Sequence, residues 1–238
     1  MIHRIIPVAV CASFLSIASV LPAAAEGVGE DEMREISGAR GVELATSGTL
    51  YLTQSDENSI LVEARSDVLP HIRTRVRNGI LVIDLDSWRG LNAGRMIFHL
   101  HLENVEHVEA SSSGDIYCDK IVGGDIVLRA ASSGEIEIGS LEADKIEAVL
   151  SSSGDISLAG QAESQELRVS SSGNYEAAEL ETAVTDARLS SSGDATVWVT
   201  GELNVELSSS GNLSYFGNPS IDTLEISSSG NITNLGDK

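Results

Sequence analysis

The sequence predicts an all-β protein built as a single-stranded parallel β-helix, a solenoid with rungs of about 19 residues. The first observation is a Ser-Ser-Gly motif, usually Ser-Ser-Ser-Gly, that recurs seven times at a nearly constant step. The second is a period-two alternation of apolar and polar residues on both sides of each motif, which is typical of strands with one buried face. The third is that no helical period occurs between the copies. The seven motifs end at Gly114, Gly134, Gly154, Gly173, Gly193, Gly211 and Gly230.

The length of one repeat favours stacked rungs over other parallel arrangements. About 20 residues hold two or three short strands and their turns, but not a strand pair with a crossover helix, which by itself needs a dozen or more residues. In the aligned copies the apolar residues form columns, so equivalent residues of successive rungs are expected to stack in register. The column six residues before each glycine holds Val108, Leu128, Ala148, Leu167, Ala187, Val205 and Leu224, and the column two residues after it holds Ile116, Ile136, Ile156, Tyr175, Ala195, Leu213 and Ile232.

The Ser-Ser-Gly motif predicts a structural ladder along the coil. Continuing the alternation through the motif places its middle Ser inward, where stacked hydroxyls pass hydrogen bonds from rung to rung. The glycine is expected where the chain bends with a positive φ or where successive rungs approach closely. The middle Ser residues are Ser112, Ser132, Ser152, Ser171, Ser191, Ser209 and Ser228.

Residues 1–25 have the features of a secretory signal peptide. Arg4 precedes an apolar run, and small residues precede an expected cleavage after Ala25. A membrane anchor is disfavoured because the apolar stretch is short and interrupted. A lipoprotein anchor is disfavoured because Cys11 follows Val10 rather than a small residue. The sequence therefore predicts export, and leaves open the periplasm, the outer surface and the medium.

The exported part divides into three segments. Residues 26–35 are expected to form an acidic, flexible leader, and residues 36–105 hold strands without the repeat, as irregular early rungs or as a small β cap over the end of the coil. The regular β-helix covers residues 106–238, and residues 36–238 form one domain. Asn78-Gly79 predicts a tight turn between two strands. In this early part the alternation predicts strands over 42–44, 49–53, 60–64, 72–76, 80–85 and 96–102.

The composition is strongly acidic, with 36 Asp and Glu against 15 Lys and Arg and a formal net charge of −21. Cleavage after Ala25 removes one basic residue, Arg4, and no acid, so the exported chain carries −22. Nucleic acid and anionic membrane surfaces are therefore poor partners, and no transmembrane segment is expected after cleavage. Cleavage also leaves Cys118 as the only cysteine. Because it falls in an inward column, it is expected to be a buried thiol rather than a reactive one.

Two groups of residues before the regular rungs invite a chemical interpretation. His99 and His101 share one strand face near His107, but only Glu103 accompanies them, which is weak support for a metal site, and no metal is predicted. The second group is a run of arginines in an otherwise acidic protein. It is interpreted as a solvated strand face that balances local acidity, with contact to an anion or acidic glycan as the alternative. These arginines are Arg65, Arg73, Arg75, Arg77, Arg89 and Arg95.

The residue after each glycine forms a polar column. Stacked carboxylates repel one another, and Ca²⁺ could neutralise them because it prefers several oxygen ligands. The Gly-Gly-x-Gly-x-Asp calcium motif is absent, however, and Asn dilutes the later copies. A solvated turn column that accepts local backbone hydrogen bonds is therefore favoured, and no cofactor is predicted. The column holds Asp115, Glu135, Asp155, Asn174, Asp194, Asn212 and Asn231.

From about Ile36 to Pro219 the chain resembles a known family, the putative auto-transporter adhesin head GIN domain. The resemblance rests on an opening Gly-Val-Glu-Leu strand, the Arg-Asn-Gly-Ile-Leu-Val-Ile turn at residues 77–83, successive Ser-Ser-Gly-Asp/Asn rungs and the closing Gly-Asn-Pro. It implies a right-handed β-helix-like fold and an adhesive role in secreted and envelope proteins of Gram-negative bacteria. It supplies no catalytic or cofactor residues. This chain departs from the pattern by keeping one more Ser-Ser-Ser-Gly copy after Pro219.

A non-enzymatic binding role is therefore predicted, with weak multivalent contacts to a glycan, matrix or envelope protein through repeated polar columns. The enzyme alternative is a polysaccharide lyase or hydrolase, but rungs this short leave little loop to wall a groove. Ordered-water binding would require Thr-rich strands, and a periplasmic structural scaffold is a further alternative. Only eight residues follow Gly230, so the last rung is expected to be uncapped and to favour end-to-end association with a second copy.

Overall fold

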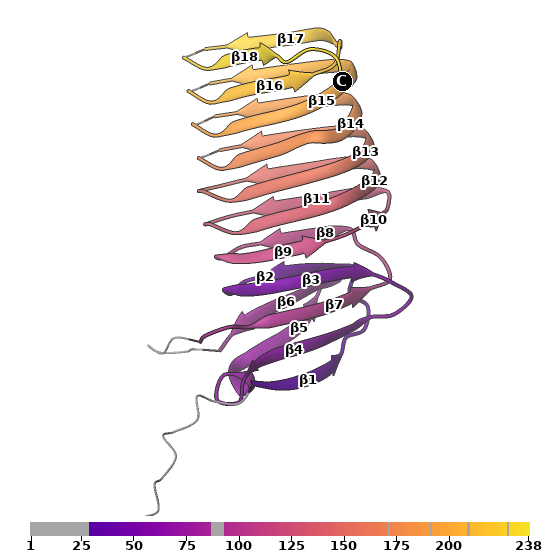
Figure 1. Ribbon diagram of the computed structural model, residues 1–238, viewed down its shortest axis with the longest axis vertical. Coiled ribbons are helices and arrows are strands. Elements are labelled where there is room, and N and C mark those ends of the chain that lie inside the picture. Colours follow the sequence, from indigo (N-terminus) through magenta and orange to yellow (C-terminus); the bar gives the residue numbers. More distant parts are fainter. Residues whose placement is uncertain (1–28, 87–92, 171, 191, 209, 228) are drawn as a thin grey trace, which may run out of the picture.

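The computed structural model describes residues 29–86, 93–170, 172–190, 192–208, 210–227 and 229–238, which form a tall β-solenoid (Figure 1). The predicted all-β parallel solenoid is thereby confirmed. Within these residues the only helical segment is the short 3₁₀ turn η1 (Leu69–His71), and none is long and apolar enough to cross a membrane. The predicted signal peptide, residues 1–25, lies outside the described residues.

Each regular rung has two strand segments, one before and one after its Ser-Ser-Gly corner, and each segment pairs in parallel with its equivalents in neighbouring rungs (Figure 1). We call the two sides the pre-glycine face and the post-glycine face. The pre-glycine face contains β8 (His107–Ala110), β11 (Asp125–Ala130), the second halves of β12 (Glu135–Leu150), β13 (Asp155–Val169), β14 (Asn174–Leu189) and β15 (Asp194–Leu207), and β17 (Ser220–Ile226). The post-glycine face contains β9 (Gly114–Cys118), then the first halves of β12, β13, β14 and β15, and finally β16 (Asn212–Phe216) and β18 (Asn231–Asn234). The short β10 (Ile121–Val122) pairs with the middle of β12.

The predicted apolar columns form the core. In the column six residues before the glycine, every member from Val108 to Val205 is at most 1% exposed, and in the column two residues after it every member from Ile116 to Leu213 is at most 2% exposed. The strand register pairs these residues one to one between rungs. Because burying one Leu or Ile side chain contributes roughly 1.5–3 kcal/mol, the columns are the main source of the solenoid's stability.

Differences in repeat length are accommodated mainly at the corner opposite the Ser-Ser-Gly turn, which we call the bulged corner. Between β12 and β13, Ile138 pairs with Leu158 but Leu141 pairs with Gly160, so β13 is shorter by one residue at this point. Gly160 has a φ of +125°, and a Cβ there would lie 2.2 Å from the carbonyl oxygen of Leu141. The length of the repeat can therefore vary slightly without disturbing the stacking of the two faces.

The N-terminal rungs stack out of sequence order. The rung made of β2 (Gly41–Leu44) and β3 (Gly48–Gln54) lies between two others (Figure 1). On one side it pairs in parallel with β6 (Ile80–Leu85) and β7 (Ile97–Leu102), and on the other with β8 and β9. The rung of β2 and β3 therefore comes first in the sequence but second in the stack. The rung of β6 and β7 lies below it, and the regular rungs, beginning with β8 and β9, lie above it.

Antiparallel strands cover the N-terminal end of the coil. β4 (Ser59–Arg65) pairs with β7, and β5 (Ile72–Arg77) pairs with β6 through the predicted tight turn, in which Asn78 and Gly79 have φ values of +52° and +83°. β1 (Gly29–Glu35) pairs with the outer edge of β4 along its whole length. Most of the expected flexible leader, 26–35, is thus a strand. Its local sequence does not reveal this because its partner, the free edge of β4, follows only after β2 and β3 along the chain.

The C-terminal end has no corresponding cover among the described residues. Leu224 and Ile226 stack on the buried Val205 and Leu207, yet they are 47% and 41% exposed. The whole of β17 is exposed, because no strand of the described chain lies beyond it. Among the described residues the last rung is therefore uncapped, as the sequence predicts.

Candidate functional site

The glycines of the Ser-Ser-Gly corner are required by close approach of successive rungs. A Cβ added at Gly134 would lie 2.7 Å from the Cβ of Ala110, and one added at Gly154 would lie 2.7 Å from the carbonyl carbon of Ala130. Gly114 and Gly173 are equally crowded by backbone of the preceding rung. None of these four glycines adopts a positive φ. Of the two reasons expected from the sequence, close approach is therefore the correct one.

The inward direction expected for the middle Ser is wrong at Ser132 and Ser152. Ser132 and Ser152 are exposed, and their φ values of +59° and +60° show that the chain reverses there. A left-handed residue interrupts the strand alternation, so the parity of the preceding strand does not continue through the corner. Ser112 is half-buried, and the remaining members of the column, Ser171, Ser191, Ser209 and Ser228, lie outside the residues whose side chains are described.

Hydroxyls of this corner contact the preceding rung through its backbone. The first Ser of a motif donates to a carbonyl oxygen one rung away: Ser170 to Leu150 at 3.2 Å and Ser227 to Leu207 at 3.4 Å. The backbone N–H of each of these Ser residues donates to the same oxygen at 3.0 Å. These hydrogen bonds reinforce the stacking of successive rungs at the corner.

The polar column after the glycine is hydrogen-bonded in its later copies. Oδ1 of Asp155 accepts hydrogen bonds from the backbone N–H of Asn174 at 2.8 Å and from its side-chain amide at 3.1 Å. Asp194 accepts the same pair of bonds from Asn212, at 3.1 and 2.8 Å. In the earlier copies, desolvation and the neighbouring carboxylates of Asp115, Glu137 and Asp155 raise the pKa of Glu135. Among the described residues no group of three or more His, Cys, Asp or Glu is placed to hold a metal ion.

Charged side chains form a ladder of ion pairs on the outside of the pre-glycine face. Glu147 lies 3.7 Å from Arg129 and 3.6 Å from Arg168, which belong to the rungs on either side. Glu166 contacts Arg168, and also Arg188 on the following rung at 3.2 Å. The register stacks Glu147 and Glu166 in one column and Arg168 and Arg188 in the next, so the acidic and basic columns lie side by side and neutralise one another in the middle of the face.

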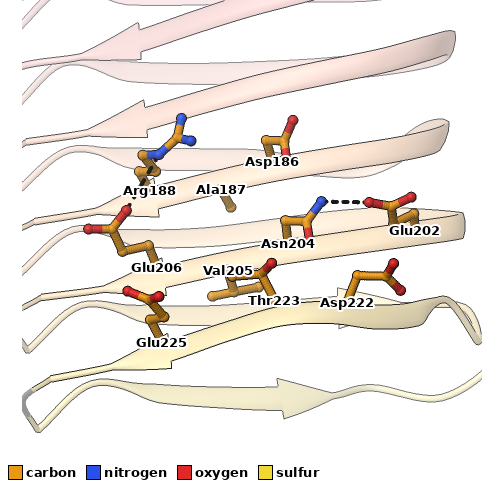
Figure 2. Close-up of a pocket in the computed structure, with 10 residues that line it drawn as sticks. All are labelled: Asp186, Ala187, Arg188, Glu202, Asn204, Val205, Glu206, Asp222, Thr223 and Glu225. Atoms are coloured by element: carbon orange, nitrogen blue, oxygen red, sulfur yellow. Dashed lines mark hydrogen bonds and ion pairs between the residues drawn. The ribbon is translucent and has the colours of Figure 1, made fainter.

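Toward the C-terminal end this ladder gives way to an acidic depression of about 510 Å³ on the same face, across β14, β15 and β17 (Figure 2). Arg188 is the one cationic side chain among the described residues that line it, and its Nε lies 3.5 Å from Glu206. The side-chain amide of Asn204 donates to Glu202 at 2.8 Å. Five carboxylates line the depression: Asp186, Glu202, Glu206, Asp222 and Glu225.

Asp222 reaches this depression because β17 carries one extra residue. Leu203 pairs with Ile221 and Asn204 pairs with Thr223, so Asp222 is inserted opposite a single peptide of β15. Such a bulge bends an edge strand and redirects a side chain. The sequence pattern identifies the outward Arg188, Glu206 and Glu225, whereas Asp222 is evident only from the pairing. Asp186 belongs to the outward column seven residues before each glycine, and this recurrence in the sequence could also have identified it.

The chemistry of the depression suits binding. It is an open, shallow surface of carboxylate, amide and hydroxyl groups, which accept and donate hydrogen bonds and attract cations. The described residues that line it include neither histidine nor cysteine. A cationic or hydroxyl-rich partner is the class that such a surface recognises.

Two arginines of the N-terminal cap, Arg73 and Arg75, form ion pairs with the same aspartate. Nε of Arg73 lies 2.7 Å from Oδ1 of Asp84, and Arg75 lies 2.6 Å from its other oxygen. Burial by itself raises the pKa of Asp84, but the hydrogen bond from Arg73 and the charge of Arg75 outweigh it and hold that pKa below its usual range. This supports a strand face that balances local acidity. Of the others, Arg65 pairs with Asp67, and Arg89 lies outside the described residues.

The histidines do not converge on one point. Each finds its own partner: His99 lies 3.0 Å from Glu63, His101 lies 3.4 Å from Ser55, and His107 lies 3.1 Å from Glu109. The ring of His99 also stacks on Tyr51, with 5.5 Å between the ring centroids. The hydrogen bond from His107 lowers the pKa of Glu109. Each of these histidines therefore has a side-chain partner on its own strand or beside a neighbouring one.

Cys118 is buried, as its column predicts, with 5% of its surface exposed. Its thiol lies 3.4 Å from the carbonyl oxygen of Lys120. Desolvation raises the pKa of the thiol to about 11. At neutral pH it is therefore protonated and unreactive.

Comparison with known proteins identifies the family of this architecture. A family model described as putative auto-transporter adhesin, head GIN domain, matches residues 40–219. Among solved structures, a putative adhesin from Bacteroides fragilis aligns with a TM-score of 0.82 at 21% identity, over 87% of this chain and 97% of that one. A putative lipid binding protein from Parabacteroides distasonis aligns with a TM-score of 0.72 at 21% identity, over 88% and 98%. At 21% identity, these alignments show that the chain shares its fold with both structures. No curated protein matches the chain in sequence.

Proposed function

Because the chain belongs to the family described as putative auto-transporter adhesin, head GIN domain, we propose that it is a non-enzymatic adhesion or binding domain exported to the cell envelope or beyond. Its partner is a glycan, a matrix component or an envelope protein. Export rests on the signal-peptide features of residues 1–25. The periplasm, the outer surface and the medium are its three possible destinations, and adhesion requires one of the last two.

The observation that carries the proposal is the pre-glycine face. It presents polar side chains at the same outward positions on each rung and ends in the acidic depression of Figure 2. Repetition at rung spacing allows several weak contacts to be made at once, and linked contacts bind far more tightly than single ones. The stacked core fixes the backbone that carries these side chains, so binding does not have to order the backbone.

The test begins with location. Intact cells that produce the full-length tagged chain are treated with protease and then fractionated. Signal on the surface or in the medium supports adhesion and directs the protein to arrays of glycans, matrix proteins and envelope proteins. Signal wholly protected in the periplasm contradicts adhesion and favours a structural scaffold. Release of sugars from an arrayed polysaccharide would instead favour the lyase or hydrolase alternative.

A matched pair of variants locates the binding face on the array. Glu206→Lys with Glu225→Lys reverses two charges in the depression, whereas Glu137→Lys with Glu176→Lys makes the same change of charge on the exposed post-glycine face. If the depression binds, only the first pair loses the array signal. Equal loss in both pairs would show that overall charge, and not this face, determines binding.

We also propose that the open C-terminal rung associates with a second copy. Ile221, Leu224 and Ile226 are between 41% and 47% exposed although they continue buried columns. The opposite end is covered by β1, β4 and β5, so end-to-end contact joins two C-terminal ends and closes as a dimer. The bulge at Asp222 places a charge on this edge, which weakens strand pairing and keeps the association weak.

A further inference from the structure

The C-terminal tail folds back along the bulged corner and ends in a pocket for its own lysine. The N–H of Leu235 donates to the carbonyl oxygen of Tyr215 at 2.8 Å, and the N–H of Gly217 donates to that of Gly236 at 2.9 Å. Gly236 has a φ of +97°, which turns the chain away from β18. Lys238 then extends back past two rungs to the corner of β14.

The ammonium group of Lys238 is surrounded by the groups that recognise such a cation. It lies over the ring of Trp198, 5.1 Å from the centroid, and over the ring of Phe216, 5.3 Å from the centroid. It is 2.6 Å from Oε1 of Glu179 and also donates to the carbonyl oxygen of Ala178. Two aromatic faces, one carboxylate and one carbonyl satisfy both the charge and the donors of a primary ammonium.

The solenoid itself assembles this pocket. Trp198 and Phe216 are register partners on β15 and β16, so their rings project from adjacent rungs at the same position. Ala178 and Glu179 belong to the rung before them, where the register shift of the bulged corner occurs between β14 and β15. Three rungs therefore supply the pocket, and the tail supplies only the group that fills it. The side chain of Lys238 is 24% exposed there.

We propose that Trp198, Phe216, Glu179 and the carbonyl of Ala178 form a binding site for a lysine side chain of a partner polypeptide, which Lys238 occupies in the free chain. A partner lysine displaces Lys238 and makes the same contacts. The formal charge of −21 favours the approach of such a basic partner. The tethered lysine competes at an effective concentration on the order of millimolar, so it screens out isolated amines and admits ligands that make further contacts.

The experiment uses the fluorescence of Trp198 in the full chain. Trp88, the other tryptophan, is replaced by Phe so that Trp198 is the sole reporter. In this background Lys238→Gln vacates the pocket, and the protein is titrated with N-acetyl-lysine methylamide at constant ionic strength. The matched ligand is N-acetyl-norleucine methylamide, whose side chain has the same four carbons and lacks the ammonium. A second variant, with residues 237–238 deleted, vacates the pocket by another route.

In both vacated variants the lysine ligand is expected to give a saturable change, with Kd on the order of 1 mM. Because the effective concentration of Lys238 is close to this Kd, the chain that retains Lys238 binds about twofold more weakly, and adding Glu179→Gln to Lys238→Gln weakens binding at least threefold. An unsaturated response, or an equal response to norleucine, in variants that keep the parent's circular dichroism spectrum would overturn the proposal. Because the readout is binding of a small amine, it can fail while adhesion is intact, and it can succeed in a protein that does not adhere.

Discussion

Inside the solenoid the hydroxyl of Tyr175 donates a hydrogen bond of 2.7 Å to the side-chain carbonyl oxygen of Gln165. Both residues are at most 2% exposed. The amide of Gln165 donates to Thr185 at 2.9 Å and to Thr182 at 3.3 Å, and Thr182 donates to the carbonyl oxygen of Trp198 at 3.0 Å. Desolvation raises the pKa of Tyr175, so its hydroxyl remains a neutral donor. This polar cluster persists in an apolar core because its members satisfy one another.

Tyr175→Phe is therefore expected to destabilise the protein. The ring still fills its column, but Oε1 of Gln165 loses its donor in a place that water does not reach. An unsatisfied buried acceptor costs about 1–3 kcal/mol in the free energy of unfolding. Urea unfolding followed by circular dichroism measures the change. Tyr117→Phe, on the outer face, removes a hydroxyl from a less buried site and serves as the control. Equal stabilities for the two variants would contradict a stabilising role for the cluster.

Gly154→Ala is expected to strain the Ser-Ser-Gly corner. Its new Cβ would lie 2.7 Å from the carbonyl carbon of Ala130, so the rungs must separate locally. Overpacking of this kind costs typically about 1–3 kcal/mol. Gly124→Ala is the matched control, because the nearest atom to its Cβ is the side-chain oxygen of Asp144 at 3.5 Å. Thermal unfolding should show a lowered midpoint for the first variant only. A lower midpoint at Gly124 than at Gly154 would refute the close-approach explanation.

Cys118 is expected to resist thiol reagents in the folded protein at pH 8. Burial shields it and raises its pKa to about 11, which leaves little thiolate to react. Ellman's reagent measures this in a chain in which Cys11 is replaced by Ser, so that Cys118 is the only thiol. One thiol per chain should react in guanidinium chloride, and almost none without it. Rapid stoichiometric reaction of the folded chain would show that the site opens.

The ion pairs of Asp84 predict a contribution to stability that depends on pH. Its folded pKa is lowered, so the unfolded state binds more protons in the range between the unfolded and folded pKa values. The contribution is therefore fully present above the unfolded pKa, near 4, and is lost as the pH falls through the folded pKa. Asp84→Asn should lower the urea midpoint at pH 7, and the difference from the parent should shrink at pH 2.5. A difference that stays constant between these pH values would rule out the charge as its cause.

End-to-end association is expected to depend on the apolar last rung. Leu224→Lys places a charge among residues that continue the core columns, so it should prevent dimer formation. Sedimentation velocity across micromolar concentrations measures the mass, with Met33→Lys, on the covered end, as the control. The parent and the control should shift toward a dimer as concentration rises. A strictly monomeric parent over this range would refute the association.

The rungs could be predicted from the sequence because a solenoid repeats one local pattern. The alternation around Gly134 determines which side chains point inward, and recurrence at a nearly constant step determines that Ile136 lies on Ile116. Neither inference requires knowledge of distant contacts, since each rung touches only its neighbours. The burial of Cys118 and the turn at Asn78-Gly79 followed from the same local rules.

Features that depend on non-repeating contacts were decided by the tertiary structure alone. The leader becomes β1 because β4 offers a free edge, and β2 with β3 is enclosed between rungs that follow it in sequence. Ser132 turns outward because the corner adopts a left-handed φ that alternation does not encode. Lys238 meets Trp198 only because the tail crosses two rungs. Periodicity specifies the stacking of equivalent residues, whereas contacts between unlike segments form only when the chain has folded and brought them together.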